Sequence, residues 1–132
     1  MTDQGLSEEV KKFIAEHINS LEQLEVLLLL HSHPQQEWTA QEVSQELRLS
    51  QASAAMRLAD LDKRGLLAVR EASDPLYRYQ PQKPDFEPTV DSLAKSYPDY
   101  RFTVINLIFS KPLDKIKTLA DAFKFREDKD GG

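Results

Sequence analysis

Residues 39–81 constrain the fold more than any other part of this chain, because they carry helix, turn, helix and strand signals in one unbroken order. Two short apolar patterns with helical spacing lie on either side of a break at Arg48 and Leu49. The second pattern ends at Gly65, a residue suited to the left-handed conformation that terminates helices. Two runs of alternating apolar and polar residues follow, separated by a turn signal at residues 72–75. This order predicts two helices joined by a tight turn, followed by a β-hairpin.

Each predicted helix of this stretch begins at a capping signal. Thr39 with Glu42 three residues later matches a capping box, and Trp38 and Val43 stand where a hydrophobic staple would lie. Ser50 is the expected cap of the second helix. The apolar residues of this second helix share one face and predict its buried side: Ala54, Leu58 and Leu61.

The run SQASAAMRLADLDKRGLL, residues 50–67, resembles the recognition helix and strand entry of the MarR-like and ArsR-like bacterial transcription regulators. The resemblance covers residues 21–81, and the spacing Leu61-x-x-x-Gly65-Leu66 is its most specific part. It implies a mainly α winged helix-turn-helix fold with a small β-hairpin wing and additional N- and C-terminal helices. It also implies binding to double-stranded DNA as a homodimer. Where members of this family typically carry basic or hydroxyl residues, this chain has Ala55 and Met56.

Seven residues are the candidate DNA contacts. The resemblance places the recognition helix, residues 50–64, in the major groove. There Gln51 suits adenine and Arg57 suits guanine, while Ser53 suits a phosphate or a base. The two arginines of the wing are expected at the DNA backbone or in the minor groove. The full set is Ser50, Gln51, Ser53, Met56, Arg57, Arg70 and Arg78.

The outward face of the recognition helix leaves two interpretations open. Ala52, Met56 and Ala59 lie opposite the buried residues and form an apolar stripe. Such a stripe can touch the methyl groups of thymine in DNA. Alternatively, the chain is an interaction module that keeps the winged-helix fold and binds a protein partner through this stripe. The sequence identifies neither such a partner nor an effector.

The formal charge of −5 is unevenly distributed along the chain. Residues 1–38 hold seven acidic and two basic residues, residues 39–79 hold six of each, and residues 80–132 hold nine of each. The whole acidic excess therefore belongs to the N-terminal region. Residues 39–79, the recognition region, are neutral, so we expect weak non-specific binding to DNA.

Helical patterns flank the recognition region on both sides. Residues 6–18 predict an amphipathic helix capped by Ser7, and residues 21–32 predict a buried helix that begins at a second capping box, Ser20 with Gln23. Residues 80–87 are rich in proline and predict an extended linker, followed by helices over residues 97–110 and from Pro112 onward. We expect residues 1–83 to form the winged domain, residues 84–126 a helical extension and residues 127–132 a disordered tail.

The helical extension carries more apolar surface than a small winged domain needs to cover. Three interpretations follow from it: dimerisation, packing back onto the domain, and a helix lying on a membrane surface. Four lysines flank the apolar edge of its last helix, as a membrane-surface helix requires, but Asp114 and Asp121 dilute the positive charge. We therefore expect a homodimer held by the N-terminal helix, the C-terminal helices or both.

Enzymatic, metal and membrane-spanning functions lack sequence support. The chain has no cysteine, no phosphate-binding glycine loop, no glycine-flanked nucleophilic serine and no helical metalloprotease motif. His31 and His33 form the closest histidine pair but have no further ligands at a recognisable spacing. The longest apolar run, residues 26–30, is far shorter than the roughly 20 residues that span a bilayer, and the polar N-terminus is unlike a secretory signal. We expect a cytoplasmic protein without enzymatic activity, metal or cofactor.

Overall fold

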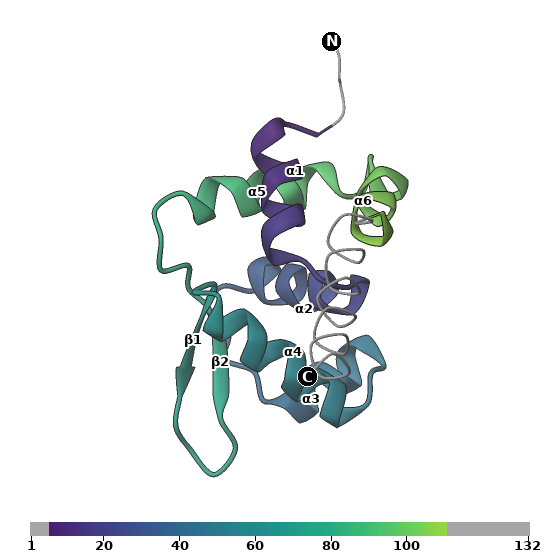
Figure 1. The fold of residues 1–132 in the computed structure, drawn as a ribbon. Helices are drawn as coiled ribbons and strands as arrows, with labels where there is room; N and C mark the ends of the chain where they lie inside the picture. The colour runs from purple at the N-terminus through teal and green to yellow at the C-terminus, as the bar shows by residue number, and fades with distance from the viewer. Residues whose placement is uncertain (1–5, 111–132) are drawn as a thin grey trace, which may run out of the picture.

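A computed structural model describes residues 6–110 of the 132-residue chain. Within these residues, helices and a two-stranded antiparallel sheet follow in the order α1 (Glu8–His17), α2 (Leu21–Ser32), α3 (Ala40–Leu47), α4 (Gln51–Lys63), β1 (Leu67–Arg70), β2 (Leu76–Tyr79), α5 (Phe86–Ser96) and α6 (Arg101–Phe109). Figure 1 shows two layers: α1, α5 and α6 lie together above α2, α3, α4 and the hairpin. The predicted fold class, mainly α with a small β wing, is confirmed.

Side-chain hydrogen bonds cap α1, α3 and α4 at the predicted residues. The Oγ atoms of Ser7 and Ser50 accept hydrogen bonds from backbone N–H groups three residues later, at 3.2 and 3.0 Å. Both halves of the predicted capping box at Thr39 and Glu42 form, at 3.1 and 2.9 Å. These bonds satisfy N–H groups that have no partner inside the first helical turn.

The second predicted capping box forms only in part. The Oγ of Ser20 accepts from the backbone N–H of Gln23, as expected, at 3.1 Å. The Gln23 side chain, however, accepts from the backbone N–H of Asn19 rather than of Ser20, at 2.6 Å. Its amide nitrogen donates to Asp60 of α4. Gln23 is buried, with 1% of its surface exposed, so this long-range partner fixes how its amide group is oriented.

One residue in the left-handed backbone conformation follows α3, and a second follows α4. Arg48, with φ of 60°, ends α3, and Gly65, with φ of 85°, ends α4 as the sequence predicted. A Cβ atom added at Gly65 would meet its nearest neighbour, Gln82, at an ordinary 3.6 Å. The glycine is therefore needed for its backbone conformation rather than for space.

The core of the winged domain forms between α2, α4 and the start of β1. Leu27, Leu58, Leu61 and Leu66 are each fully buried in one cluster. This confirms the predicted inner side of α4. Leu58 and Leu61 lie three residues apart and therefore share one face of α4, which packs against the core. The opposite face of the helix is exposed.

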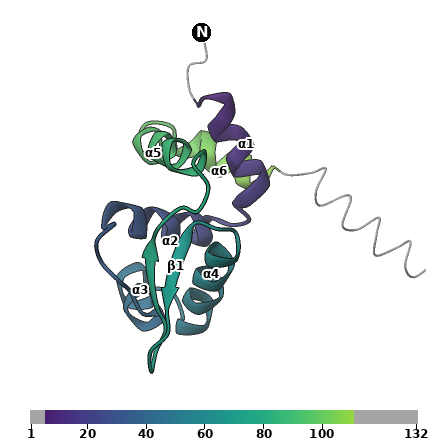
Figure 2. The same cartoon turned by 90° about the vertical axis from the view of Figure 1, so that its left-hand side faces the viewer.

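The wing is anchored to the segment that precedes α3. In the hairpin, Leu67 pairs with Tyr79 and Val69 with Tyr77. Trp38 extends this ladder on the outer edge of β2, because its N–H and carbonyl groups both bond to Tyr77, at 2.7 and 2.8 Å. Figure 2 shows the hairpin beside α3 and α4, with its tip directed away from α1 and α5.

Helix α5 differs from the predicted extended linker, and α6 begins later than predicted. The predicted linker over residues 80–87 overlaps the first turn of α5, and Pro88 is the third residue of that helix. A proline is tolerated there because the N–H groups of the first turn need no intrahelical partner. Residues 97–100 close the end of α5, so α6 begins at Arg101 rather than at residue 97. The helix predicted from Pro112 and the tail at 127–132 lie outside the described residues.

Helix α1 packs onto its own chain. Val10, Phe13 and Ile14 are buried, and the rings of Phe13 and Phe86 of α5 meet edge to face with centroids 5.8 Å apart. Helix α1 also contacts α6. The apolar face of the leading helix is therefore covered by the C-terminal helices of the same chain. Within residues 6–110, none of the helices combines the length and the apolar character needed to cross a membrane.

Candidate nucleic-acid interface

The outward side of α4 is apolar and small, as the sequence predicted. Ala52, Ala55 and Ala59 are exposed, and 56% of the Met56 surface is accessible. Gln51 is exposed in the first turn of the helix. The surface that α4 offers to a partner thus consists of methyl groups, a thioether and one amide.

The wing and the starts of α3 and α4 surround one hollow of about 200 Å³. Residues 39–41, Gln51 and Ala55 line it from the helices, and Asp74, Pro75 and Tyr77 line it from the wing. Residues 71–75 at the tip include Asp74 and a second exposed carboxylate, Glu71, and carry no basic residue. The tip therefore repels rather than attracts a phosphate backbone.

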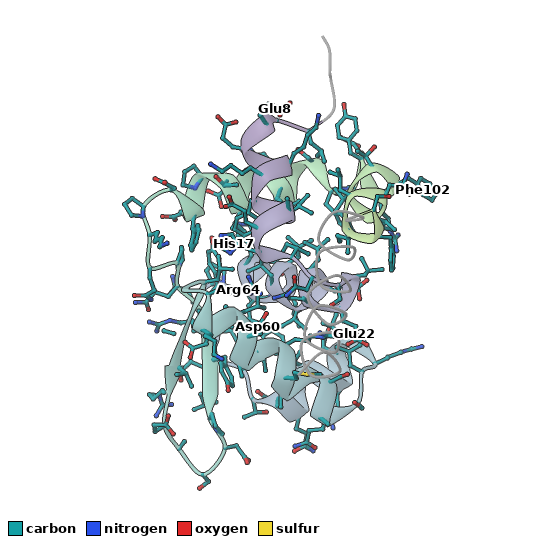
Figure 3. The ribbon with its side chains drawn as sticks, in the orientation of Figure 1. Glu8, His17, Glu22, Asp60, Arg64 and Phe102 are labelled. Carbon is teal, nitrogen blue, oxygen red and sulfur yellow. The ribbon has the colours of Figure 1, made fainter. Side chains whose placement is uncertain are left out.

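Arg57 faces α2 rather than the outward side of α4. Its Nε lies 3.2 Å from a carboxylate oxygen of Glu22, and the two side chains are 26% and 38% exposed. Figure 3 marks Glu22 near α4. The side chain that was predicted to read guanine is thus ion-paired within the protein.

Arg70 makes a two-pronged contact with Glu37, the residue before Trp38. Its Nε and Nη2 donate to the two carboxylate oxygens of Glu37, at 3.0 and 2.9 Å. The hydrogen bond from Arg70 holds the pKa of Glu37 below its usual value, and the positive charge of Arg78 acts in the same direction. The pKa of Arg70 is raised in turn by Glu37. Arg78 itself donates to the side chain of Gln80.

A polar network ties α4 to the junction between α1 and α2. Asp60 accepts from Gln23 and, at 2.9 Å, from Arg64, whose second nitrogen donates to the backbone carbonyl of Glu16 at 3.1 Å. Figure 3 shows Asp60 and Arg64 next to each other, below the end of α1. Sequence reasoning missed this network, because Gln23 and Asp60 are 37 residues apart and no local pattern links them.

The seven predicted DNA contacts therefore divide into three groups. Gln51 and Met56 face outward from α4. Ser50 and Ser53 belong to the helix cap, in which the Ser50 oxygen accepts a hydrogen bond from the backbone N–H of Ser53. The third group consists of arginines that already have partners within the protein: Arg57, Arg70 and Arg78. Two further cations of the recognition region, Arg48 and Lys63, are exposed and form no ion pair with the residues that the structure describes.

The two neighbouring histidines have separate partners. The Nε2 of His31 lies 2.7 Å from the Asp91 carboxylate of α5, and His33 contacts the Ser32 hydroxyl at 2.9 Å. Within residues 6–110, no group of three or more potential ligands surrounds a metal position. These contacts make His31 part of the connection between the two layers.

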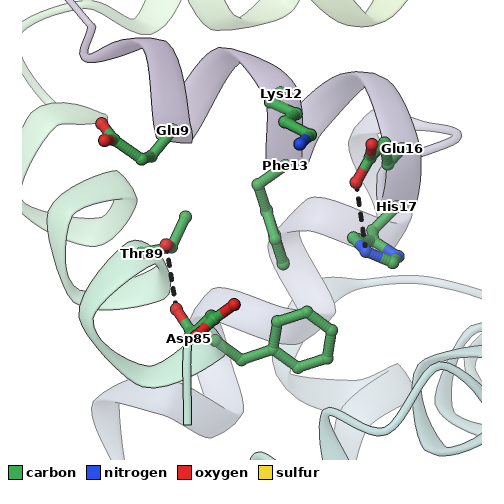
Figure 4. A pocket seen from close by; sticks show the side chains of 8 residues that line it. Glu9, Lys12, Phe13, Glu16, His17, Asp85 and Thr89 are labelled. Carbon is green, nitrogen blue, oxygen red and sulfur yellow. Dashed lines mark hydrogen bonds and ion pairs between the residues drawn. The ribbon is translucent and has the colours of Figure 1, made fainter. Parts of the chain in front are cut away.

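A second hollow lies between α1 and α5. Glu9, Lys12 and Phe13 of α1 face Asp85 and Thr89 across it (Figure 4). Its volume of about 200 Å³ is below the roughly 300–1,000 Å³ of typical sites for drug-sized ligands. The hollow therefore gives no support for a bound effector of that size.

Neither a family model nor a curated protein sequence matches this chain, but solved structures do. MepR, a transcription regulator of the Staphylococcus aureus multidrug efflux pump MepA, aligns with a TM-score of 0.53 at 13% identity, over 92% of this chain and 87% of MepR. The F27L mutant of MepR, with the same TM-score, is bound to an oligodeoxyribonucleotide. HlyU from Vibrio cholerae aligns with a TM-score of 0.52 at 24% identity, over 67% of this chain and 88% of HlyU.

A third similar protein is BpsR of Bordetella bronchiseptica, whose DNA binding is regulated by 6-hydroxynicotinic acid. It aligns with a TM-score of 0.50 at 20% identity, over 92% of this chain and 83% of BpsR. At such low identities the agreement establishes the fold. The chain has a winged-helix fold similar to those of MepR, HlyU and BpsR.

Proposed function

We propose that this chain is a cytoplasmic, sequence-specific DNA-binding transcription regulator that acts as a homodimer, with α4 in the major groove. The observation that carries the proposal is that the exposed Gln51 and Ala55 of α4 line one hollow together with wing residues 74–77. In helix-turn-helix proteins the second helix enters the major groove and presents its first residues to the base edges. The DNA-bound MepR mutant has the same overall fold.

The proposal assigns base reading to the N-terminal half of α4. The amide of Gln51 can bond adenine in two places, and Met56 with its neighbouring alanines can contact thymine methyl groups. Ser50 and Ser53 lie at the start of the helix, where phosphates approach. Arg57, Arg70 and Arg78 are assigned to the DNA backbone and base edges as additional contacts.

An exposed aromatic stripe on α6 supports the homodimer. Phe102 and Phe109 are 83% and 61% exposed, and the half-buried Ile105 lies between them on the same side of the helix. Contiguous exposed apolar side chains of this kind mark interaction surfaces. In the proposed dimer a second copy covers this stripe, and two α4 helices about 34 Å apart match successive major grooves.

The test is a fluorescence-anisotropy titration with duplexes from the region upstream of the protein's own gene, at about 50 mM salt, where phosphate contacts are strongest. Met56→Glu should abolish binding, because it brings a carboxylate into the groove. Gln51→Ala should weaken binding by about 1–3 kcal/mol at one base position. Gln35→Ala, in the exposed loop after α2, is the matched control. Absence of any binding by the wild-type chain under these conditions would refute the DNA-binding function.

The exposed stripe on α4 also favours a second candidate function, a winged-helix module that binds a protein. Met56 and three exposed alanines form the stripe, beside an acidic wing tip. The same titration separates the two functions. For a protein-binding module, Met56→Glu should remove partner binding, and the wild-type chain should not bind any duplex.

A further inference from the structure

Two acidic residues from outside the recognition region lie on two of its arginines. Glu22 belongs to α2, and Glu37 precedes the strand-like segment at Trp38. Both belong to residues 1–38, which hold the whole acidic excess of the chain. The fold thus brings carboxylates of the N-terminal region onto Arg57 and Arg70, the arginines assigned to DNA.

The contact between Glu37 and Arg70 uses the hydrogen-bond donors that a phosphate would need. Arginine binds carboxylates and phosphates through the same pair of parallel N–H groups. Glu37 occupies Nε and Nη2 of Arg70 with its two oxygens, at 3.0 and 2.9 Å. Glu22 occupies Nε of Arg57 at 3.2 Å. A phosphate cannot take the Nε and Nη2 donors of Arg70, or the Nε donor of Arg57, while the carboxylate is in place.

Stability gives little reason for the pair of Glu37 and Arg70. Arg70 is 62% exposed, so solvent screens this contact, whereas Arg57 is 26% exposed and its contact with Glu22 is partly buried. Exposed ion pairs add little to the free energy of folding. Their larger effect is on the charge that the recognition region presents to DNA.

We propose that Glu22 and Glu37 are internal competitors of DNA, which the duplex must displace from Arg57 and Arg70 in order to bind. The inference rests on the proposed DNA-binding function. It adds that two carboxylates of the same chain regulate binding at that surface. Non-specific binding depends on free cations that release counterions from the duplex. Glu22 and Glu37 occupy N–H groups of two arginines, so DNA binding depends more on base contacts by α4. The two carboxylates therefore suppress non-specific binding.

The test uses Glu→Gln substitutions in the full chain, because glutamine keeps the shape of the side chain and removes its charge. Glu22→Gln and Glu37→Gln should each raise the affinity for a random-sequence duplex, roughly two- to fivefold beyond the matched controls. Each should also steepen the dependence of log affinity on log salt by about 0.9. The controls are Glu25→Gln on α2 and Glu46→Gln on α3, which remove the same charge from residues without an ion pair to these arginines within the described part of the chain.

A double substitution tests whether the effect passes through the arginine. In an Arg70→Ala background, Glu37→Gln should give no gain beyond that of Glu46→Gln. The inference would be overturned if Glu37→Gln still raised the affinity for the duplex in the absence of Arg70. It would also be overturned if the affinities of Glu22→Gln and Glu37→Gln equalled those of the controls.

Retention on immobilised heparin separates this inference from the proposed function. Heparin is a polyanion that needs no base recognition, so Glu37→Gln should elute at higher salt than Glu46→Gln. Equal elution would overturn the inference even if the wild-type chain binds its duplex. Later elution combined with no duplex binding by any form would support carboxylate control of Arg70 and refute the DNA-binding function.

Discussion

At the scale of single residues, Tyr79 shows how burial changes the chemistry of a group. Its side chain is 8% exposed, and its hydroxyl has no hydrogen-bond partner within residues 6–110. Burial, together with the negative charges of Asp91 and Glu87, raises the pKa of Tyr79 well above 10. The fold therefore accommodates only the neutral form of this side chain.

Tyr79→Phe should leave stability at pH 7 unchanged or slightly higher, because it removes a buried hydroxyl that lacks a partner. In the unfolded chain the tyrosine ionises near pH 10, so the wild-type protein should lose stability as the pH rises above that value. The variant should lose less. Urea unfolding at pH 7 and at about pH 10.5 measures both effects, with Tyr100→Phe as an exposed control. A loss of more than about 1 kcal/mol at pH 7 would mean that the hydroxyl is hydrogen-bonded.

At the scale of elements, α4 has two sides with different roles. Leu58 and Leu61 are fully buried against α2 and β1, whereas Met56 is exposed on the opposite side. The polar network around Asp60 fixes the same helix to the junction of α1 and α2. Its packing and its recognition surface are thus carried by separate residues.

Leu61→Ala should destabilise the fold by about 2–5 kcal/mol, because it leaves a cavity in the core. Met56→Ala should change stability by less than about 0.5 kcal/mol, as is usual for exposed positions. Denaturant unfolding of both variants gives the comparison. Similar costs for the two substitutions would contradict the observed orientation of α4.

At the scale of the whole molecule, His31 and Arg64 each join the two layers by a polar contact. His31 of α2 bonds to Asp91 of α5 at 2.7 Å, and its ring meets that of Tyr79 edge to face with centroids 5.1 Å apart. The upper layer buries Phe86, Val90 and Leu93 of α5, but leaves the stripe on α6 uncovered by the described residues. Figure 3 shows Phe102 at the outer side of this layer.

Phe102→Glu should convert the proposed dimer into a monomer, because burying one phenylalanine contributes about 1.5–3 kcal/mol and burying a charge is unfavourable. Light scattering coupled to size exclusion at micromolar concentration measures the mass. Thr103→Glu, exposed on another side of α6, should stay dimeric. A wild-type chain that elutes as a stable monomer would rule out the dimer.

The sequence alone determined those features that depend on near neighbours in the chain. The caps at Ser7, Thr39 and Ser50 join residues three apart, and the periodicity of α4 repeats every turn. Gly65 predicts a left-handed backbone conformation at its own position, because glycine adopts positive φ without steric cost. Helix α5 was missed because its early proline was interpreted as a break. The seven DNA contacts remain a prediction.

Only the tertiary structure decided which charges meet. Glu22 and Arg57 are 35 residues apart, and Glu37 and Arg70 are 33 apart. Along the sequence, the acidic excess lies in residues 1–38, and residues 39–79 are neutral. The fold places part of that excess on the arginines predicted to bind DNA. Coulomb interactions depend on distance in space, and folding sets that distance independently of separation along the sequence.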